Sequence, residues 1–257
     1  MKTTLFTVLF VVVAGMGTIH AAIVNGPCGK NLTWTLNTKS GVLTIEGKGE
    51  MNSRNYSYEK NWQIYRENIK SVNLPEGLTN IEANAFANCY SLSSVNIPKS
   101  VKKIETGVFD YCKSLTAIEI PDNVTFIGSG AFRGCVSLTS VAIPNNVTVI
   151  GNYAFAGCYN LTIVTIGNSV TDIGEHAFDG CRRLTSMILP KSIKFIGYNI
   201  FNNTNIMSVI LYATTPPSLE ASMGIESKCT LYVPAESVDT YVNLLRWEDF
   251  KQIKAIK

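Results

Sequence analysis

The sequence predicts a repeat solenoid, in which short parallel strands stack into one extended sheet. Cysteine recurs every 23 residues, at Cys89, Cys112, Cys135, Cys158 and Cys181. Phenylalanine and isoleucine keep the same period, at Phe86, Phe109, Phe132, Phe155, Phe178 and Phe201 and at Ile81, Ile104, Ile127, Ile150, Ile173 and Ile196. Apolar residues that recur with a period of roughly 20–50 residues are typical of stacked repeat architectures. The chain is therefore expected to form one elongated domain with specialised ends.

Residues 1–22 have the features of a secretory signal peptide. Lys2 supplies a positive start, an apolar run extends from Leu5 to Val13, and the small residues Ala21 and Ala22 precede the expected cleavage. A membrane anchor is the alternative, but the run is shorter than the roughly 20 apolar residues that span a bilayer. We expect an exported mature chain without a transmembrane segment.

Residues 23–68 are expected to form an N-terminal β cap. Segments 32–36 and 42–45 alternate in polarity around a polar turn that ends at Gly41, which is typical of a hairpin. Trp62 and Tyr65 are placed to cover the first repeat. A cap is needed because an end repeat of a solenoid cannot bury both of its faces by itself.

The repeats occupy residues 69–212. Each clear unit, such as residues 115–135, reads L-x-x-V/I-x-I/L-P-x-x-V-x-x-I-G-x-x-A-F-x-x-C. Its alternating start predicts a strand with one buried face. The proline ends that strand because it has no N–H to donate. The second half is rich in turn residues and predicts short β or 3₁₀ pieces.

Three apolar columns should point inward from the strands. They are Leu92, Leu115, Leu138, Leu161 and Leu184; Val95, Ile118, Val141, Val164 and Met187; and Ile97, Ile120, Ile143, Ile166 and Leu189. We expect Met207 and Ile210 to continue them in the last repeat, with Tyr212 replacing the aliphatic residue. Residues 213–257 should then form a C-terminal cap. Its expected parts are a strand at 230–233, a helix that follows Pro234 and runs to about Leu245, and a seal of Trp247, Phe250 and Ile253.

The five periodic cysteines are expected to be a structural ladder of buried thiols. Equivalent residues of a solenoid stack about 4.8 Å apart. Their Cβ vectors then run parallel, which suits a disulfide poorly. Cys28 and Cys229 lie near opposite ends of the solenoid and should not reach each other. The chain has no C-x-x-C, and His176 is the one histidine beyond the signal, so we assign no metal ligands.

The repeat unit and both flanking segments resemble the BspA-like family of leucine-rich repeats. The repeat follows the family pattern across residues 69–212, and segments 28–36 and 229–250 look like its front cap and closing segment. The resemblance implies a right-handed leucine-rich-repeat β-solenoid with an N-terminal β-hairpin cap and a C-terminal strand–helix cap. It also implies an exported protein, often at a bacterial surface. Some members of the family are linked to adhesion, in which they bind host matrix proteins or other cells. It supplies no catalytic residues that can be placed here.

The outward side of the strands is the candidate binding surface. Its variable residues become apolar toward the carboxyl end: Asn96, Glu119, Ala142, Ile163, Thr165, Ile188 and Leu211. Contiguous exposed apolar patches often mark contacts. We therefore expect a protein or glycan partner at a cell surface. In the alternative interpretation, the closing segment covers these residues, or the repeats have simply drifted.

Composition argues against several other functions. The formal net charge is +3, and the mature chain without Lys2 would carry +2, so nothing favours nucleic acid or acidic lipid. Catalytic groups are scarce, and Asp172, Glu175 and His176 on one turn are a common chance grouping. We therefore assign no catalytic residue and no cofactor. Two other functions stay open: an exported hydrolase with a shallow carboxylate site, and a surface component that self-associates into a homo-oligomer. The cluster of Arg182, Arg183, Lys191 and Lys194 is interpreted as a solvated edge.

Overall fold

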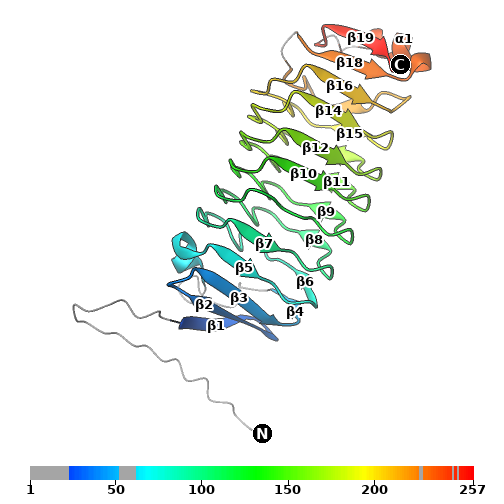
Figure 1. Cartoon of the computed structure of the whole chain (residues 1–257). Coiled ribbons are helices and arrows are strands. Elements are labelled where there is room, and N and C mark those ends of the chain that lie inside the picture. The colour runs from blue at the N-terminus through cyan, green and yellow to red at the C-terminus, as the bar shows by residue number, and fades with distance from the viewer. Residues whose placement is uncertain (1–22, 52–61, 226–227, 245, 248) are drawn as a thin grey trace.

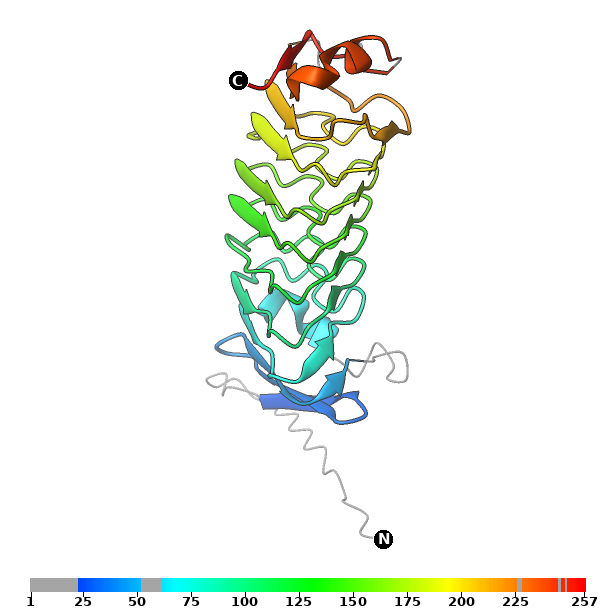
Figure 2. The ribbon, with the colours of Figure 1, turned by 90° about the vertical axis from the view of Figure 1, so that its right-hand side faces the viewer.

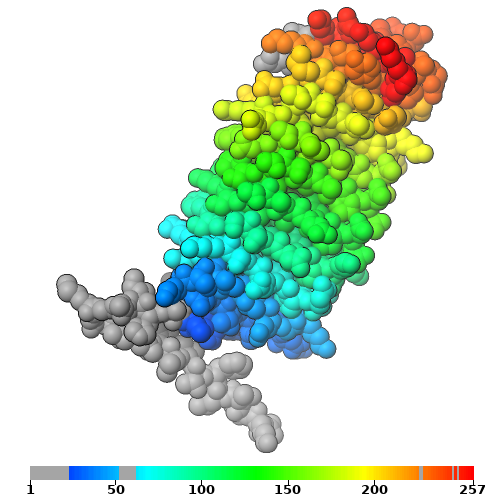
Figure 3. All heavy atoms as spheres, in the orientation of Figure 1, coloured from blue at the N-terminus to red at the C-terminus, as the bar shows by residue number. Residues whose placement is uncertain are grey.

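The computed structural model describes residues 23–51, 62–225, 228–244, 246–247 and 249–257. The expected signal segment, residues 1–22, lies outside the described residues. The described chain is a β-solenoid of about eight turns that stack from the N-terminal to the C-terminal end (Figures 1 and 2). Each turn is called a coil below. Figure 3 shows the stack as a continuous rod.

One long side of the rod is a row of parallel strands, called the front sheet. Its strands are β5 (Ser71–Asn73), β7 (Ser94–Asn96), β10 (Ser140–Ile143), β12 (Ile163–Ile166), β14 (Ser186–Leu189), β16 (Ser208–Leu211), β18 (Thr230–Val233) and β19 (Gln252–Ala255). Pairing in the first repeats is parallel at a 23-residue offset, as in Val72 with Val95 and Ala142 with Thr165. Parallel pairing between successive repeats is confirmed for β5 with β7, β10 with β12 and β14 with β16.

The opposite side is built from shorter strands that pair in the same way. They are β6 (Leu78–Asn80), β8 (Lys103–Ile104), β9 (Phe126–Ile127), β11 (Val149–Ile150), β13 (Asp172–Ile173), β15 (Phe195–Ile196) and β17 (Ser218–Leu219). The back sheet is one parallel sheet in which the strands pair in the order β8, β9, β11, β13, β15 and β17. Ile81, which follows β6, forms a parallel bridge with Ile104 of β8. The short β pieces expected in the second half of each repeat are therefore present.

Both ends of the rod carry specialised elements. At the N-terminal end, β1 (Ile23–Gly29), β2 (Leu32–Asn37) and β3 (Val42–Gly47) form antiparallel pairs, and β3 then pairs in parallel with β5. β4 (Gly49–Glu50) pairs with β6, and the 3₁₀ helix η2 (Trp62–Asn68) leads into the first repeat. At the C-terminal end, β18 and β19 are separated by η3 (Ala235–Ser237) and α1 (Val238–Val242). This helical segment is shorter than predicted, and Leu245 lies outside the described residues. No helix in the described part of the chain has the length and apolar character needed to cross a membrane.

An aromatic stack runs along the core of the rod. The six periodic phenylalanines, Phe86 to Phe201, are buried, and neighbouring ring centroids lie 5.2–6.4 Å apart. Trp62 stacks on Phe86 at 5.9 Å and its Nε1 donates to the carbonyl of Ala85 at 2.8 Å. Trp34 then meets Trp62 edge to face at 6.0 Å. The N-terminal elements thus extend the core before the first repeat, as a cap must.

The last repeat corrects one sequence-based assignment. Met187 pairs with Val209 and Leu189 with Leu211, an offset of 22 residues rather than 23. The cause is the turn after Phe201, which reaches Ile206 in five residues where Phe178 reaches Leu184 in six. A shift of one residue exchanges the two faces of a strand. Ile206, Val209 and Leu211 therefore fill the inward columns. The expectation that Met207 and Ile210 do so was wrong.

Candidate functional site

The outward side chains of the front sheet form two columns, called the front face. Alternation along each strand sends every second residue outward. The first column is Ser71, Ser94, Ala117, Ser140, Ile163, Ser186, Ser208 and Thr230. The second is Asn73, Asn96, Glu119, Ala142, Thr165, Ile188, Ile210 and Tyr232. Where the strands pair in parallel, neighbouring members of a column lie about 4.8 Å apart.

Six of the seven predicted partner-binding residues lie on this face. Asn96, Glu119, Ala142, Ile163, Thr165 and Ile188 are all exposed and follow one another along neighbouring coils. Leu211 is a correction, because it pairs with Leu189 and is completely buried. Ile210 occupies the outward place instead and is half-buried. The short turn after Phe201 is the signal in the sequence that could have shown this.

The C-terminal half of the front face is apolar and open. Ile163 is 61 % exposed and Ile188 is 52 % exposed, which is unusual for large aliphatic side chains. Ala142 precedes them, and Ile210 and Tyr232 continue the second column. We call Ala142, Ile163, Ile188 and Ile210 the apolar patch. Isoleucine is β-branched and stiff at χ1, so the patch loses little side-chain entropy when a partner covers it.

The front face carries almost no charge. From Ser94 to Ile210 its two columns hold serine, threonine, asparagine, alanine and isoleucine, with Glu119 as the one charged member. The basic residues Arg182, Arg183, Lys191 and Lys194 are exposed but stand outside both columns. The guanidinium carbon of Arg182 lies 4.8 Å from the ring centroid of Tyr159. The front face therefore offers shape and apolar contact rather than net charge.

The C-terminal elements leave the front face uncovered. β18 and β19 continue the front sheet in parallel register, with Tyr232 beside Ile210 and Lys254 beside Tyr232 (Figure 1). α1 packs at the end of the rod, where the buried hydroxyl of Tyr241 donates to the carbonyl of Ala213 at 2.8 Å. In the described residues, the closing segment thus extends the sheet and does not fold over the patch, while the interpretation that the repeats have simply drifted stays open.

The cysteine ladder lies inside the coils and contributes nothing to the surface. Cys89, Cys112, Cys135, Cys158 and Cys181 are buried free thiols. The Sγ of each of the last four donates to a phenylalanine carbonyl, as Cys135 does to Phe109 at 3.2 Å. Burial raises the pKa of Cys89 and Cys181 to about 12 because a thiolate would lose its hydration. Protonated thiols at this depth are neither nucleophiles nor metal ligands.

Groups with catalytic potential are engaged in local structure. The Nδ1 of His176 lies 3.1 Å from a carboxylate oxygen of Asp179, and its ring stacks on Tyr153. Asp172 accepts a hydrogen bond from the Thr171 hydroxyl at 2.5 Å. Across the described residues, no three His, Cys, Asp or Glu side chains are grouped so that they could hold a metal ion. These observations single out no hydrolytic constellation, so the front face is the candidate site.

A family model matches most of the repeat region. The model for the BspA type leucine-rich repeat region matches six copies, over residues 63–162 and 102–217. Together these matches cover more than half of the chain. No curated protein matches it.

Solved structures of bacterial leucine-rich repeat proteins share the fold. A leucine-rich repeat protein from Bacteroides ovatus is 19% identical with a TM-score of 0.57, covering 94% of this chain and 77% of its own. A leucine rich cell surface protein from Faecalibacterium prausnitzii is 24% identical with a TM-score of 0.56, covering 93% and 74%. A leucine-rich repeat protein of T. pallidum is 24% identical with a TM-score of 0.54, covering 87% and 95%. At such identities the likeness shows the fold alone.

Proposed function

Because the chain belongs to the BspA-type leucine-rich repeat family, we propose that it is an exported, non-enzymatic protein that binds another protein through its front face. The observation that carries the proposal is the apolar patch, where Ile163 and Ile188 remain largely exposed on an uncharged sheet. Apolar area removed from water contributes about 25 cal/mol per Å² to the free energy of association, before the costs of binding are subtracted. A flat row of eight strands offers that area over several coils.

The chemistry of the front face favours a protein over a glycan. Isoleucine and alanine pack against the aliphatic and aromatic side chains that form the core of a protein interface. A sugar has few apolar surfaces and is held mainly by aromatic rings and convergent hydrogen-bonding groups. The face between Ser94 and Ile210 has no aromatic residue.

Export and surface location are parts of the same proposal. The amino-terminal segment has the charge, apolar run and small residues of a secretory signal. A structural relative from F. prausnitzii is described as a cell surface protein. A surface protein with an extended binding face would act in adhesion, by holding a protein of a host matrix or of another cell.

The test is capture of partners with matched variants. Purified protein is incubated with host matrix proteins and with bacterial surface extracts, and retained proteins are identified and their affinities measured. Ile163→Asp and Ile188→Asp should each weaken binding about tenfold or more, because a carboxylate would be desolvated without a partner. Val242→Asp is the control, since Val242 is 58% exposed on α1, away from the front face.

Two outcomes would contradict the proposal. One is a folded Ile188→Asp variant that binds the captured protein as tightly as the original. The other is failure to retain any protein. Sedimentation of the same samples separates the self-association alternative, in which the original chain is an oligomer and Ile188→Asp is a monomer.

A further inference from the structure

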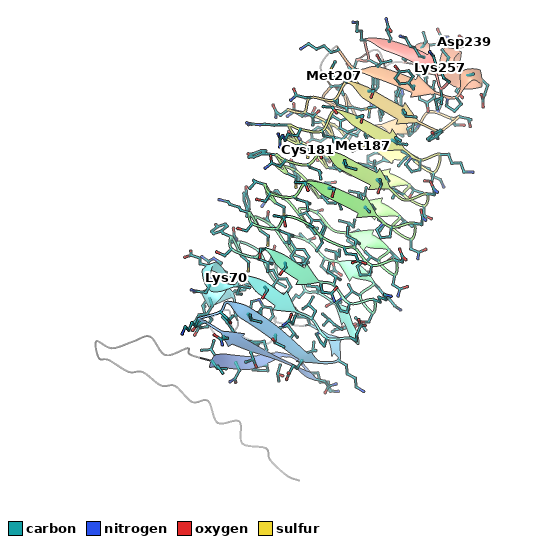
Figure 4. All side chains as sticks on the ribbon, viewed as in Figure 1. Lys70, Cys181, Met187, Met207, Asp239 and Lys257 are labelled. Carbon is teal, nitrogen blue, oxygen red and sulfur yellow. The ribbon has the colours of Figure 1, made fainter. Side chains whose placement is uncertain are left out.

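Aromatic side chains gather on a different part of the rod. Tyr90, Tyr111, Tyr153 and Tyr159 are each 37–45% exposed, and all come from the turns that lead from the back sheet to the front sheet. We call this side the tyrosine flank. Cys181 and Met207, which are labelled in Figure 4, belong to the corresponding turns of later coils.

The flank has a regular backbone in which a left-handed position recurs from coil to coil. Gly107, Gly130, Tyr153, His176 and Asn199 are equivalent and share a left-handed conformation, with φ between 53° and 64°. Hydrogen bonds link the coils here, as from Gly130 N to Asn152 O and from Tyr153 N to Glu175 O, both at 2.8 Å. Side chains at this position therefore form a column along the rod.

That column contains a gap at Gly130. The Tyr153 ring stacks on His176, with centroids 4.8 Å apart and planes 6° from parallel. In the column, the position next to Tyr153 on the side away from His176 is Gly130, which has no side chain. A methyl group at Gly130 would meet a single neighbour, Cβ of Arg133 at 3.8 Å. On the side of the gap away from Tyr153, the side chain of Asn84 lies over Gly107 and forms the other boundary of the gap.

A neutral ion pair borders the gap. Arg133 donates from Nε and Nη2 to the two carboxylate oxygens of Asp110, at 2.9 and 2.5 Å. Its guanidinium carbon lies 5.3 Å from the ring centroid of Tyr111. The hydrogen bond to Asp110 raises the pKa of Arg133, and the guanidinium stays paired with this carboxylate.

We propose that the gap over Gly130, between Tyr153 and Asn84, binds one ring of a neutral saccharide. The face of an aromatic ring is electron-rich and attracts the weakly positive C–H bonds on one side of a sugar ring. Asn84 and the Arg133–Asp110 pair supply donors and acceptors for hydroxyl groups. Because Asp110 already neutralises Arg133, an acidic sugar gains little from the guanidinium. The site is separate from the front face and does not depend on the function proposed for it.

The test is isothermal titration of the purified protein with neutral hexasaccharides of β-linked glucose, mannose, xylose and N-acetylglucosamine, and with acidic hexagalacturonate. We expect at least one neutral hexasaccharide to bind, and Tyr153→Ala to weaken its binding about tenfold or more. Gly130→Asn should weaken binding similarly, because asparagine tolerates the left-handed backbone and fills the gap. Tyr90→Ala is the control, since Tyr90 is 38% exposed but lies outside the gap.

Three results would overturn this inference: no binding of any neutral hexasaccharide, tighter binding of hexagalacturonate, or equal affinity in Tyr153→Ala. A captured protein that needs Tyr153, without saccharide binding, would also overturn it and identify the flank as a protein contact. Ile188→Asp should leave saccharide binding unchanged. The failure of the front-face proposal is therefore distinguishable from the failure of this one.

Discussion

Each cysteine of the ladder is a small buried group whose ionisation opposes folding. Cys135 is completely buried and donates to the carbonyl of Phe109 at 3.2 Å. Burial raises the pKa of Cys89 and Cys181 from 9.0 to about 12, and raises the pKa of Cys112, Cys135 and Cys158 as well. The unfolded chain then releases these protons at lower pH than the folded chain. Their contribution to stability is complete below about pH 8.5 and is lost as pH rises toward the folded pKa.

We predict that the free energy of unfolding falls above about pH 9, by about 1.4 kcal/mol per pH unit for each buried thiol. Cys135→Ala should be less stable at neutral pH, because it removes packed atoms from the core. Its free energy of unfolding should nevertheless decline less steeply at high pH, because the variant has one buried thiol fewer to ionise. Urea unfolding at a series of pH values up to about 10.5 measures both slopes. Equal slopes in the two proteins would contradict the prediction, because Cys135 would then ionise as readily in the folded chain as in the unfolded chain.

At the scale of elements, β16 shows where sequence patterns lose their power. Residues 207–212 read Met-Ser-Val-Ile-Leu-Tyr, so apolar side chains occur on both faces of the strand. Alternation alone then leaves the register open. The register is decided by the shortened turn after Phe201 and by pairing with β14, which place Leu211 inside and Ile210 outside. In the earlier repeats the turns are equally long, so equivalent residues stay aligned from coil to coil. The repeat pattern therefore predicted correctly that Ile163 and Ile188 point outward.

The buried phenol of Tyr241 anchors the C-terminal helix. The hydroxyl of Tyr241 donates to Ala213 O at 2.8 Å, and its ring meets Trp247 edge to face at 4.8 Å. Tyr241→Phe should cost about 1 kcal/mol of unfolding free energy, because a buried carbonyl loses its donor. Tyr241→Ala should cost about 3–5 kcal/mol, as for other large aromatic truncations. Urea unfolding at neutral pH checks both values, with the exposed Tyr212→Phe as control. A Tyr241→Phe protein as stable as the original would show that the hydrogen bond contributes nothing.

At the scale of the whole molecule, the 23-residue period predicted the solenoid and the parallel front sheet, and the alternation of segments 32–36 and 42–45 predicted the N-terminal hairpin. Two features of the surface did not follow from these patterns. The course of the closing segment depends on the pairing of β18 with β19, which joins segments separated by a helical turn. The gap at Gly130 depends on the left-handed backbone of each turn and on the direction in which Tyr153 stacks. Neither pairing nor ring direction is visible in residue spacing.

Photo-crosslinking tests the central claim, that the front face binds a protein, most directly. A benzophenone amino acid is placed at position 188 on the front face or, in a second protein, at position 103, an exposed residue of the back sheet. Both proteins are irradiated with host matrix proteins and bacterial surface extracts. We predict a discrete crosslinked protein from position 188 that is absent from position 103. Crosslinks from position 103 alone, or equally from both positions, would contradict it.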